Sequence, residues 1–205
     1  MIDVHTEAAL TLITLNRADK ANALTAQMLA ELADAVEGAQ HAQVLILTGK
    51  GKVFSAGMDL EAAKSGLATS PVWERLSGAI AAFPGLSIAA LNGTVAGGAM
   101  GMILACDMRI SVPGAKVFYP VMKLGFLPQP SDPMRLADLI GPARAKLILM
   151  AGQKVPVEEA HSFGLIDEIV ADGDVVARAR DLAADTLAAA PNHARAIKAF
   201  FETSQ

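Results

Sequence analysis

From Leu91 to Ala99 the chain reads LNGTVAGGA, and this stretch says most about the fold. It continues the apolar run Ser87–Leu91, which is typical of a buried strand, and it leads into Gly97–Cys106, which is apolar on all sides and predicts a buried helix. A glycine pair at a helix start presents unpaired backbone N–H groups and lets a substrate oxygen approach the backbone closely. Gly97 and Gly98 therefore predict either a site for developing negative charge or a close-packing point between helix and sheet.

The segments on either side of this stretch repeat its pattern. Val44–Leu47 is a continuous apolar run that predicts a strand covered on both faces, and the small-residue loop Phe54–Leu60 (FSAGMDL) follows it. Met108–Val112 and Lys116–Tyr119 predict a further strand pair. The middle of the chain thus recurs as strand, turn, strand and helix, which favours a coiled stack of such units over a doubly wound sheet.

The two ends of the chain add a strand pair and a set of helices. Ile2–His5 and Leu10–Leu15 predict paired strands, and Thr25 predicts the N-cap of a helix that ends at Gly38. The elements expected towards the C-terminus are helices over Asp132–Ile140, Ala143–Met150 and Val157–Phe163, a strand over Leu165–Val170, and helices over Asp174–Ala190 and His193–Phe201.

Composition limits the classes of function. The 205 residues are 53% hydrophobic and 4% aromatic, which predicts one domain with a core of small aliphatic side chains. A net charge of −4 without a basic run argues against a nucleic-acid partner. Cys106 is the single cysteine, no leader is evident, and no apolar run is long enough to span a bilayer, so we expect a cytoplasmic protein without a membrane partner.

Several short motifs occur together in one order over about 190 residues. They are Leu15-Asn16-Arg17 with Asn22-Ala23-Leu24, Leu45–Gly49 with Phe54–Leu60, Asn92–Ala99, Leu124-Gly125 with Pro128, Gly141-Pro142-Ala143, and Ala160 with Phe163-Gly164-Leu165. In this set the chain resembles the crotonase (enoyl-CoA hydratase/isomerase) superfamily. The resemblance implies an α/β ClpP/crotonase-type spiral of repeated ββα units, with a spiral core over residues 1–170 and a short C-terminal helical segment over residues 171–205.

The resemblance also implies a thioester site. In the family, two backbone N–H groups hold the thioester oxygen as it gains enolate character, and the matching residues here are Met58 and Gly98. The residues that match the family's coenzyme A contacts are Lys20, Ala21, Ala56, Asp59 and Leu60. Taken alone, Asp59 also fits a turn cap, and Lys20 fits a solvated surface lysine.

The chain departs from the family pattern at the acidic residues. The two glutamates of family hydratases match Gly101 and Val121, neither of which can transfer a proton. The acid of one group of family isomerases matches Gln129, and the nearest carboxylate is Asp132. Asp132 is therefore the candidate general base if its loop folds inward, although Asp followed by Pro133 is also a common helix N-cap pair, and the two roles can coincide.

Two further residue types were weighed as candidates. Tyr119, the single tyrosine, is either a hydrogen-bonding partner of the substrate or a packing residue. The four histidines lack metal-ligand spacing, so we expect no metal.

We therefore expect an acyl-CoA thioester enzyme that is isomerase-like rather than a classical hydratase, with a non-catalytic acyl-CoA-binding protein of the same fold as the alternative. No cofactor is expected beyond the coenzyme A of the substrate. The resemblance implies a homotrimer or homohexamer. Because family members usually carry further C-terminal helices, part of the acyl pocket wall is expected to be missing or to come from a neighbouring subunit.

Overall fold

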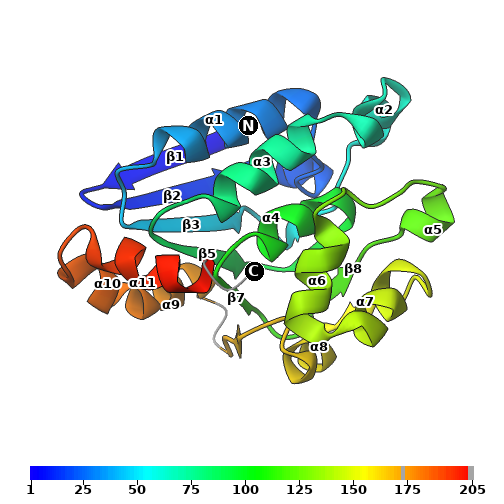
Figure 1. The fold of residues 1–205 in the computed structure, drawn as a ribbon. Coiled ribbons are helices and arrows are strands. Elements are labelled where there is room, and N and C mark those ends of the chain that lie inside the picture. Colours follow the sequence, from blue (N-terminus) through cyan, green and yellow to red (C-terminus); the bar gives the residue numbers. More distant parts are fainter. Residues whose placement is uncertain (172–173, 203–205) are drawn as a thin grey trace.

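The computed structural model describes residues 1–171 and 174–202, which form two β-sheets with helices around them (Figure 1). The larger sheet has the order β1-β2-β3-β5-β7-β10, and the smaller sheet has the order β4-β6-β8-β9. The larger sheet consists of β1 (Ile2–Glu7), β2 (Leu10–Leu15), β3 (Val44–Gly49), β5 (Leu86–Leu91), β7 (Met108–Ser111) and β10 (Glu168–Ile169). The smaller sheet consists of β4 (Val53–Ser55), β6 (Thr94–Ala96), β8 (Lys116–Phe118) and β9 (Val155–Pro156).

Three consecutive strand pairs, β3–β4, β5–β6 and β7–β8, build the spiral. In each pair the first strand joins the larger sheet and the second joins the smaller one, and the strands within each sheet run parallel from pair to pair. This confirms the coiled stack of strand, turn, strand and helix units. It also corrects one prediction: β7 and β8 are both strands, but they do not pair with each other, because each pairs with the equivalent strand of the preceding unit.

Both faces of the larger sheet are covered, as the continuous apolar run in β3 predicts. Leu45 and Leu47 face the main core, which is covered by α1 (Ala26–Gly38) and α3 (Val72–Ala81). Val44 and Ile46 face a second cluster, which α9 (Val175–Leu182) completes on the opposite side (Figure 1). The alternation along one strand thus fills two cores.

The N-terminal elements agree with the sequence. β1 and β2 form an antiparallel pair in which Ile2 lies opposite Leu15. The Thr25 side chain accepts a hydrogen bond from the backbone N–H of Met28 at 3.2 Å, so it caps α1 as expected.

The remaining helices surround the smaller sheet and the C-terminal end. They are α2 (Leu60–Lys64), α4 (Met100–Leu104), α5 (Val121–Leu124), α6 (Asp132–Ile140), α7 (Pro142–Leu149), α8 (Val157–Phe163), α10 (Ala184–Ala188) and α11 (His193–Glu202), with short 3₁₀ turns η1 (Ala18–Lys20), η2 (Leu67–Thr69) and η3 (Gly97–Ala99). Within the described residues, no helix is long and apolar enough to cross a membrane.

Two C-terminal predictions need correction. The helix expected over Asp174–Ala190 is divided at Ala183 into α9 and α10, with Asp174 capping α9 through the N–H of Ala177. The strand expected over Leu165–Val170 is reduced to the two residues of β10. Residues 172–173 and 203–205 of the expected segment 171–205 lie outside the described residues.

Candidate active site

Two loops meet where β4 and β6 end side by side. The parallel register places Ser55 beside Val95, so the chain leaves both strands at the same edge of the smaller sheet. Gly57 and Gly97 follow with positive φ angles of 86° and 57°. A methyl group added at Gly57 would lie 2.6 Å from the carbonyl oxygen of Ala96, so only glycine allows the two backbones to come this close.

Each loop contributes residues to the lining of a common cavity. Around Met58 the chain is fixed by hydrogen bonds of 2.7 Å from Leu24 N–H to the Gly57 carbonyl and of 2.9 Å from Asp59 N–H to the Leu24 carbonyl. Gly98 lies in the first turn of η3, where N–H groups have no intrahelical acceptor. In the described chain, neither the Met58 N–H nor the Gly98 N–H donates a hydrogen bond, and both residues line one cavity of ≈170 Å³.

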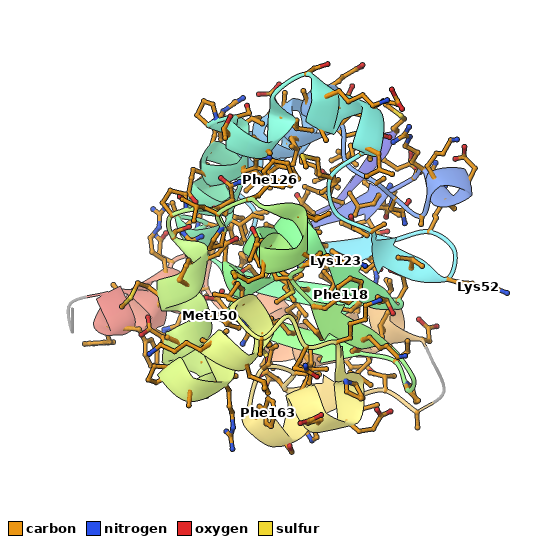
Figure 2. The ribbon with its side chains drawn as sticks, turned by 90° about the vertical axis from the view of Figure 1, so that its right-hand side faces the viewer. Lys52, Phe118, Lys123, Phe126, Met150 and Phe163 are labelled. Atoms are coloured by element: carbon orange, nitrogen blue, oxygen red, sulfur yellow. The ribbon has the colours of Figure 1, made fainter. Side chains whose placement is uncertain are left out.

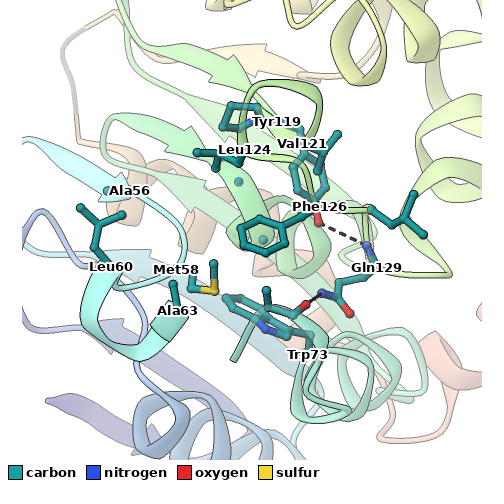
Figure 3. Close-up of a pocket in the computed structure, with 15 residues that line it drawn as sticks. Ala56, Met58, Leu60, Ala63, Trp73, Tyr119, Val121, Leu124, Phe126 and Gln129 are labelled. Atoms are coloured by element: carbon teal, nitrogen blue, oxygen red, sulfur yellow. Dashed lines mark hydrogen bonds between the residues drawn. The ribbon is translucent and has the colours of Figure 1, made fainter. Parts of the chain in front are cut away.

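The walls of this cavity are mainly apolar (Figure 3). The Trp73 ring is part of the lining, and a methyl group added at Gly98 would be 2.9 Å from the ring carbons. The indole N–H of Trp73 donates to the Leu67 carbonyl at 2.8 Å, which fixes the ring. Phe126 is 39% exposed and Leu60 is 77% exposed, so apolar side chains also border the opening.

Asp132 lies behind one wall of the cavity and does not cap a helix. The N-cap of α6 is Ser131, and Asp132 is the first helical residue with a fully buried side chain. Its Oδ2 accepts a 3.0 Å hydrogen bond from the Tyr119 hydroxyl, and its Oδ1 has no partner among the described residues. The N-cap interpretation of Asp132 is therefore wrong, because the carboxyl points into the interior instead of towards the backbone of α6.

Burial raises the pKa of the Asp132 carboxyl to about 7. The hydrogen bond from Tyr119 lowers this pKa, the charge of Glu74 raises it, and the charge of Arg135 lowers it. Burial also raises the pKa of the Tyr119 hydroxyl, so this side chain stays neutral at ordinary pH. Near pH 7 the pair can therefore either hold or release one proton.

The space next to Asp132 is created by a missing side chain. A methyl group added at Gly101 would lie 3.0 Å from Asp132 Oδ1, so the carboxyl occupies the volume into which a residue at position 101 would project. Val121, at the position of the second hydratase glutamate, is buried and lines the cavity. The carboxyl next to α4 thus comes from α6.

The residues predicted to contact coenzyme A come from two segments that a backbone hydrogen bond connects. Ala56 N–H donates to the Ala21 carbonyl at 2.9 Å, which joins the turn containing Lys20 to the loop that contains Met58. Lys20 is exposed at the end of η1, while Ala56 and Leu60 line the cavity.

Asp59 has a clear structural role. Its carboxylate caps α2 through the N–H groups of Glu61 and Ala62 and pairs with Arg17 at 2.6 Å. The hydrogen bond from Arg17 and those from the α2 backbone lower the pKa of this carboxyl. The turn-cap interpretation of Asp59 is therefore confirmed.

Comparison with known proteins decides the family. The family model described as enoyl-CoA hydratase/isomerase matches residues 5–205. The chain belongs to this crotonase family. It is 35% identical over 198 residues to YngF of Bacillus subtilis, which is named provisionally as an enoyl-CoA hydratase/isomerase, and the match covers 92% of this chain and 76% of YngF.

Two other relatives extend the comparison. The chain is 30% identical to 4-chlorobenzoyl coenzyme A dehalogenase-2 of an Arthrobacter species, with 94% of this chain and 74% of the relative covered. The solved structure of Pseudomonas aeruginosa DspI superposes with a TM-score of 0.90 at 30% identity, covering 99% of this chain and 80% of that one. The crotonase fold expected from the sequence is thus confirmed, and the family includes chemistry beyond hydration.

Sequence reasoning missed two features of the site. Trp73 was not identified as a wall of the cavity, although a lone tryptophan in an otherwise aromatic-poor helix could have marked it. The contact between Tyr119 and Asp132 was also missed, because it joins residues on β8–α5 and α6 that only the fold brings together.

The buried carboxyl predicts a specific pH dependence of stability. In the unfolded chain Asp132 ionises near its ordinary pKa, whereas in the fold it ionises only near 7, so its contribution to stability is present at low pH and is lost as the pH rises through 7. From pH 5 to pH 8 this loss amounts to roughly 2–3 kcal/mol of unfolding free energy. Asp132→Asn should remove the loss in urea unfolding curves, whereas Asp138→Asn, at an exposed position on the same helix, should follow the wild type. Parallel pH curves for wild type and Asp132→Asn would contradict the assignment.

Proposed function

We propose that this protein is an acyl-CoA isomerase that moves a double bond of a 3-enoyl thioester into conjugation with the carbonyl. The observation that carries the proposal is that Met58 and Gly98, whose N–H groups donate no hydrogen bond within the described residues, line one apolar cavity, with the Asp132 carboxyl beside Gly101. Removal of a proton from carbon 2 of such a substrate places negative charge on the thioester oxygen. The two N–H groups would stabilise that charge, and a single preorganised donor is worth about 3–4 kcal/mol in known enzymes.

Asp132 is the proposed acceptor of the proton. A pKa near 7 suits this role, because a base whose pKa lies close to the working pH is both available and able to return the proton. The proton taken from carbon 2 would return to carbon 4, so that nothing is consumed and the product is the 2-enoyl thioester. Water is not needed at any step.

The residues at the hydratase positions argue against hydration as the main reaction. Gly101 and Val121 carry no group that can activate water or protonate carbon 2. The relatives support a family that works on coenzyme A thioesters with different reactions, since one of them is named as a dehalogenase.

The coenzyme A part of the substrate would lie along Lys20, Ala21, Ala56, Asp59 and Leu60. Lys20 is the proposed phosphate contact, because its side chain is exposed beside the opening and has no partner within the described residues. Asp59 would contribute through its backbone, since its carboxylate is occupied by Arg17 and α2. No metal and no cofactor other than this coenzyme A is proposed, and the cytoplasmic location stays a prediction.

The acyl group is proposed to be short. The cavity volume of ≈170 Å³ is close to that of a cavity of about 150 Å³ that holds benzene, and the Trp73 ring is part of its lining. The alternative function is an acyl-CoA-binding protein without turnover. It is favoured by one observation, the complete burial of the Asp132 side chain behind the cavity wall.

Incubation with a short 3-enoyl-CoA tests these functions. We expect formation of the conjugated thioester, seen as an increase in ultraviolet absorbance, and a loss of at least 100-fold in kcat in Asp132→Asn because the proton acceptor is removed. Asp138→Asn should keep the wild-type rate. Tight binding without conversion of any acyl chain would favour the binding protein, and rapid hydration of crotonyl-CoA by the pure protein would refute the choice of isomerase over hydratase.

We also propose that the chain forms a homotrimer, or a homohexamer made of two trimers. Apolar side chains are exposed together over α5, α6, α7 and the loop before α6, on the side that faces the viewer in Figure 2, where Phe126 and Met150 are labelled. The exposed residues of this surface are Met122, Leu124, Phe126, Leu127, Met134 and Met150. A contiguous apolar surface of this kind is typical of a protein–protein interface.

Sedimentation velocity at micromolar concentration tests the assembly. The mass expected is three or six times the 21.2 kDa of the chain. Met134→Glu should shift the distribution towards the monomer, because it places a charge in the proposed interface, whereas Glu61→Gln on the exposed face of α2 should not. A wild-type monomer at this concentration would contradict the proposal.

A further inference from the structure

Asp132 has no direct access to the substrate cavity. Its side chain is fully buried, and the residues that line the cavity include Tyr119, Val121 and Gln129 but not Asp132. The side chain is held at the start of α6 between Gly101 and Tyr119. If the proposed function is correct, a proton that travels between substrate and Asp132 must cross this wall.

Tyr119 is the residue that joins the two sides of the wall. It lines the cavity (Figure 3). Its hydroxyl donates a 3.0 Å hydrogen bond to Asp132 Oδ2. The Tyr119 hydroxyl oxygen also accepts a 3.4 Å hydrogen bond from the backbone N–H of Gln129. A hydroxyl oxygen has two lone pairs, so one acceptor position on Tyr119 remains for a substrate proton.

We propose that the Tyr119 hydroxyl is the catalytic group that exchanges protons with the substrate, and that Asp132 acts through it. This inference rests on the proposed isomerase function. In the first step the carbon 2–hydrogen bond breaks, its proton forms a new O–H bond at Tyr119, and the previous Tyr119 proton passes to Asp132 Oδ2. The electron pair of the broken bond moves into the enolate, whose oxygen lies between the N–H groups of Met58 and Gly98.

The second step reverses the proton movement at a different carbon. Asp132 returns its proton to the Tyr119 oxygen while the Tyr119 proton forms a bond to carbon 4, and the enolate electrons form the conjugated double bond. Tyr119 never carries a full charge, which agrees with its burial. Both side chains end in the protonation state in which they began, and no oxidant, reductant or water enters the reaction.

The charged groups around the pair are compatible with this transfer. Glu74 accepts hydrogen bonds from the N–H and hydroxyl of Ser131, so its charge is held close to Asp132. Arg135 lies one turn along α6 and carries a buried Nη1 without a partner in the described chain. Because their charges act on the Asp132 pKa in opposite directions, neither fixes the carboxyl permanently in one state.

The single tyrosine of the chain permits a specific test. Biosynthetic replacement of tyrosine by 3-fluorotyrosine changes the hydroxyl acidity at position 119 alone and adds a ¹⁹F label there. We expect the ¹⁹F resonance to shift when a non-reactive acyl-CoA binds, and we expect kcat for a short 3-enoyl-CoA to change at least threefold while KM changes less than twofold. Phe118→Leu, at the residue before Tyr119 and outside the cavity lining, is the control for general disturbance at the end of β8.

Substitutions then test whether the two side chains act in series. Tyr119→Phe, Asp132→Asn and the double variant should all lose kcat by at least about 100-fold and to the same extent, because a relay fails at either member. The dissociation constant for the non-reactive acyl-CoA should change less than threefold in each. Three results would each overturn the relay. They are a loss of kcat in the double variant equal to the product of the two single losses, an active Tyr119→Phe, and a ¹⁹F resonance that does not shift when acyl-CoA binds.

The failure of the isomerase function itself would look different. In that case the wild-type protein would convert no 3-enoyl-CoA before any variant is compared, and the relay would be rejected with it. An active wild type with an active Tyr119→Phe but an inactive Asp132→Asn would reject the relay alone and keep Asp132 as the direct base.

Discussion

The close approach of two backbone segments is the constraint on which the site depends. Residues 57–58 and 97–98 come together because β4 and β6 are parallel neighbours, and only glycine fits at Gly57. A residue without a side chain is also required at Gly93 in the preceding turn, where a methyl group would lie 2.1 Å from the Lys52 carbonyl oxygen. Glycines thus let two loops approach each other closely, and both loops line one cavity.

Much of this arrangement follows from the sequence. Some elements are determined by residues close together in the sequence, so the local pattern predicts them correctly. Examples are the apolar strands β3 and β5, the helical turn at Gly97-Gly98 and the N-cap at Thr25. Pairing between distant strands has no local signal, which explains why β7 and β8 were wrongly expected to pair. The position of Asp132 could not be decided for the same reason, since its cap-like sequence is overridden by contacts with Tyr119 and Gly101.

Position 101 has no side chain, and a carboxyl from another helix, that of Asp132, lies in the adjacent space. Burying an ionisable group in this way costs stability near neutral pH, which is a common price of a functional site. The buried carboxyl beside α4 thus comes from α6 in this chain, and it contacts Tyr119, the residue that follows β8.

The most direct measurement of the central claim is the carbonyl stretching frequency of a bound thioester. Isotope-edited infrared difference spectra of a saturated short acyl-CoA with a ¹³C-labelled carbonyl report the hydrogen bonds to that oxygen alone. The account predicts a band at lower frequency than for the thioester free in water. It also predicts that the shift is lost in Gly98→Ala, where the added methyl meets Trp73, and kept in Gly38→Ala, where nothing lies within 4 Å. A bound thioester with an unshifted carbonyl band would contradict the account.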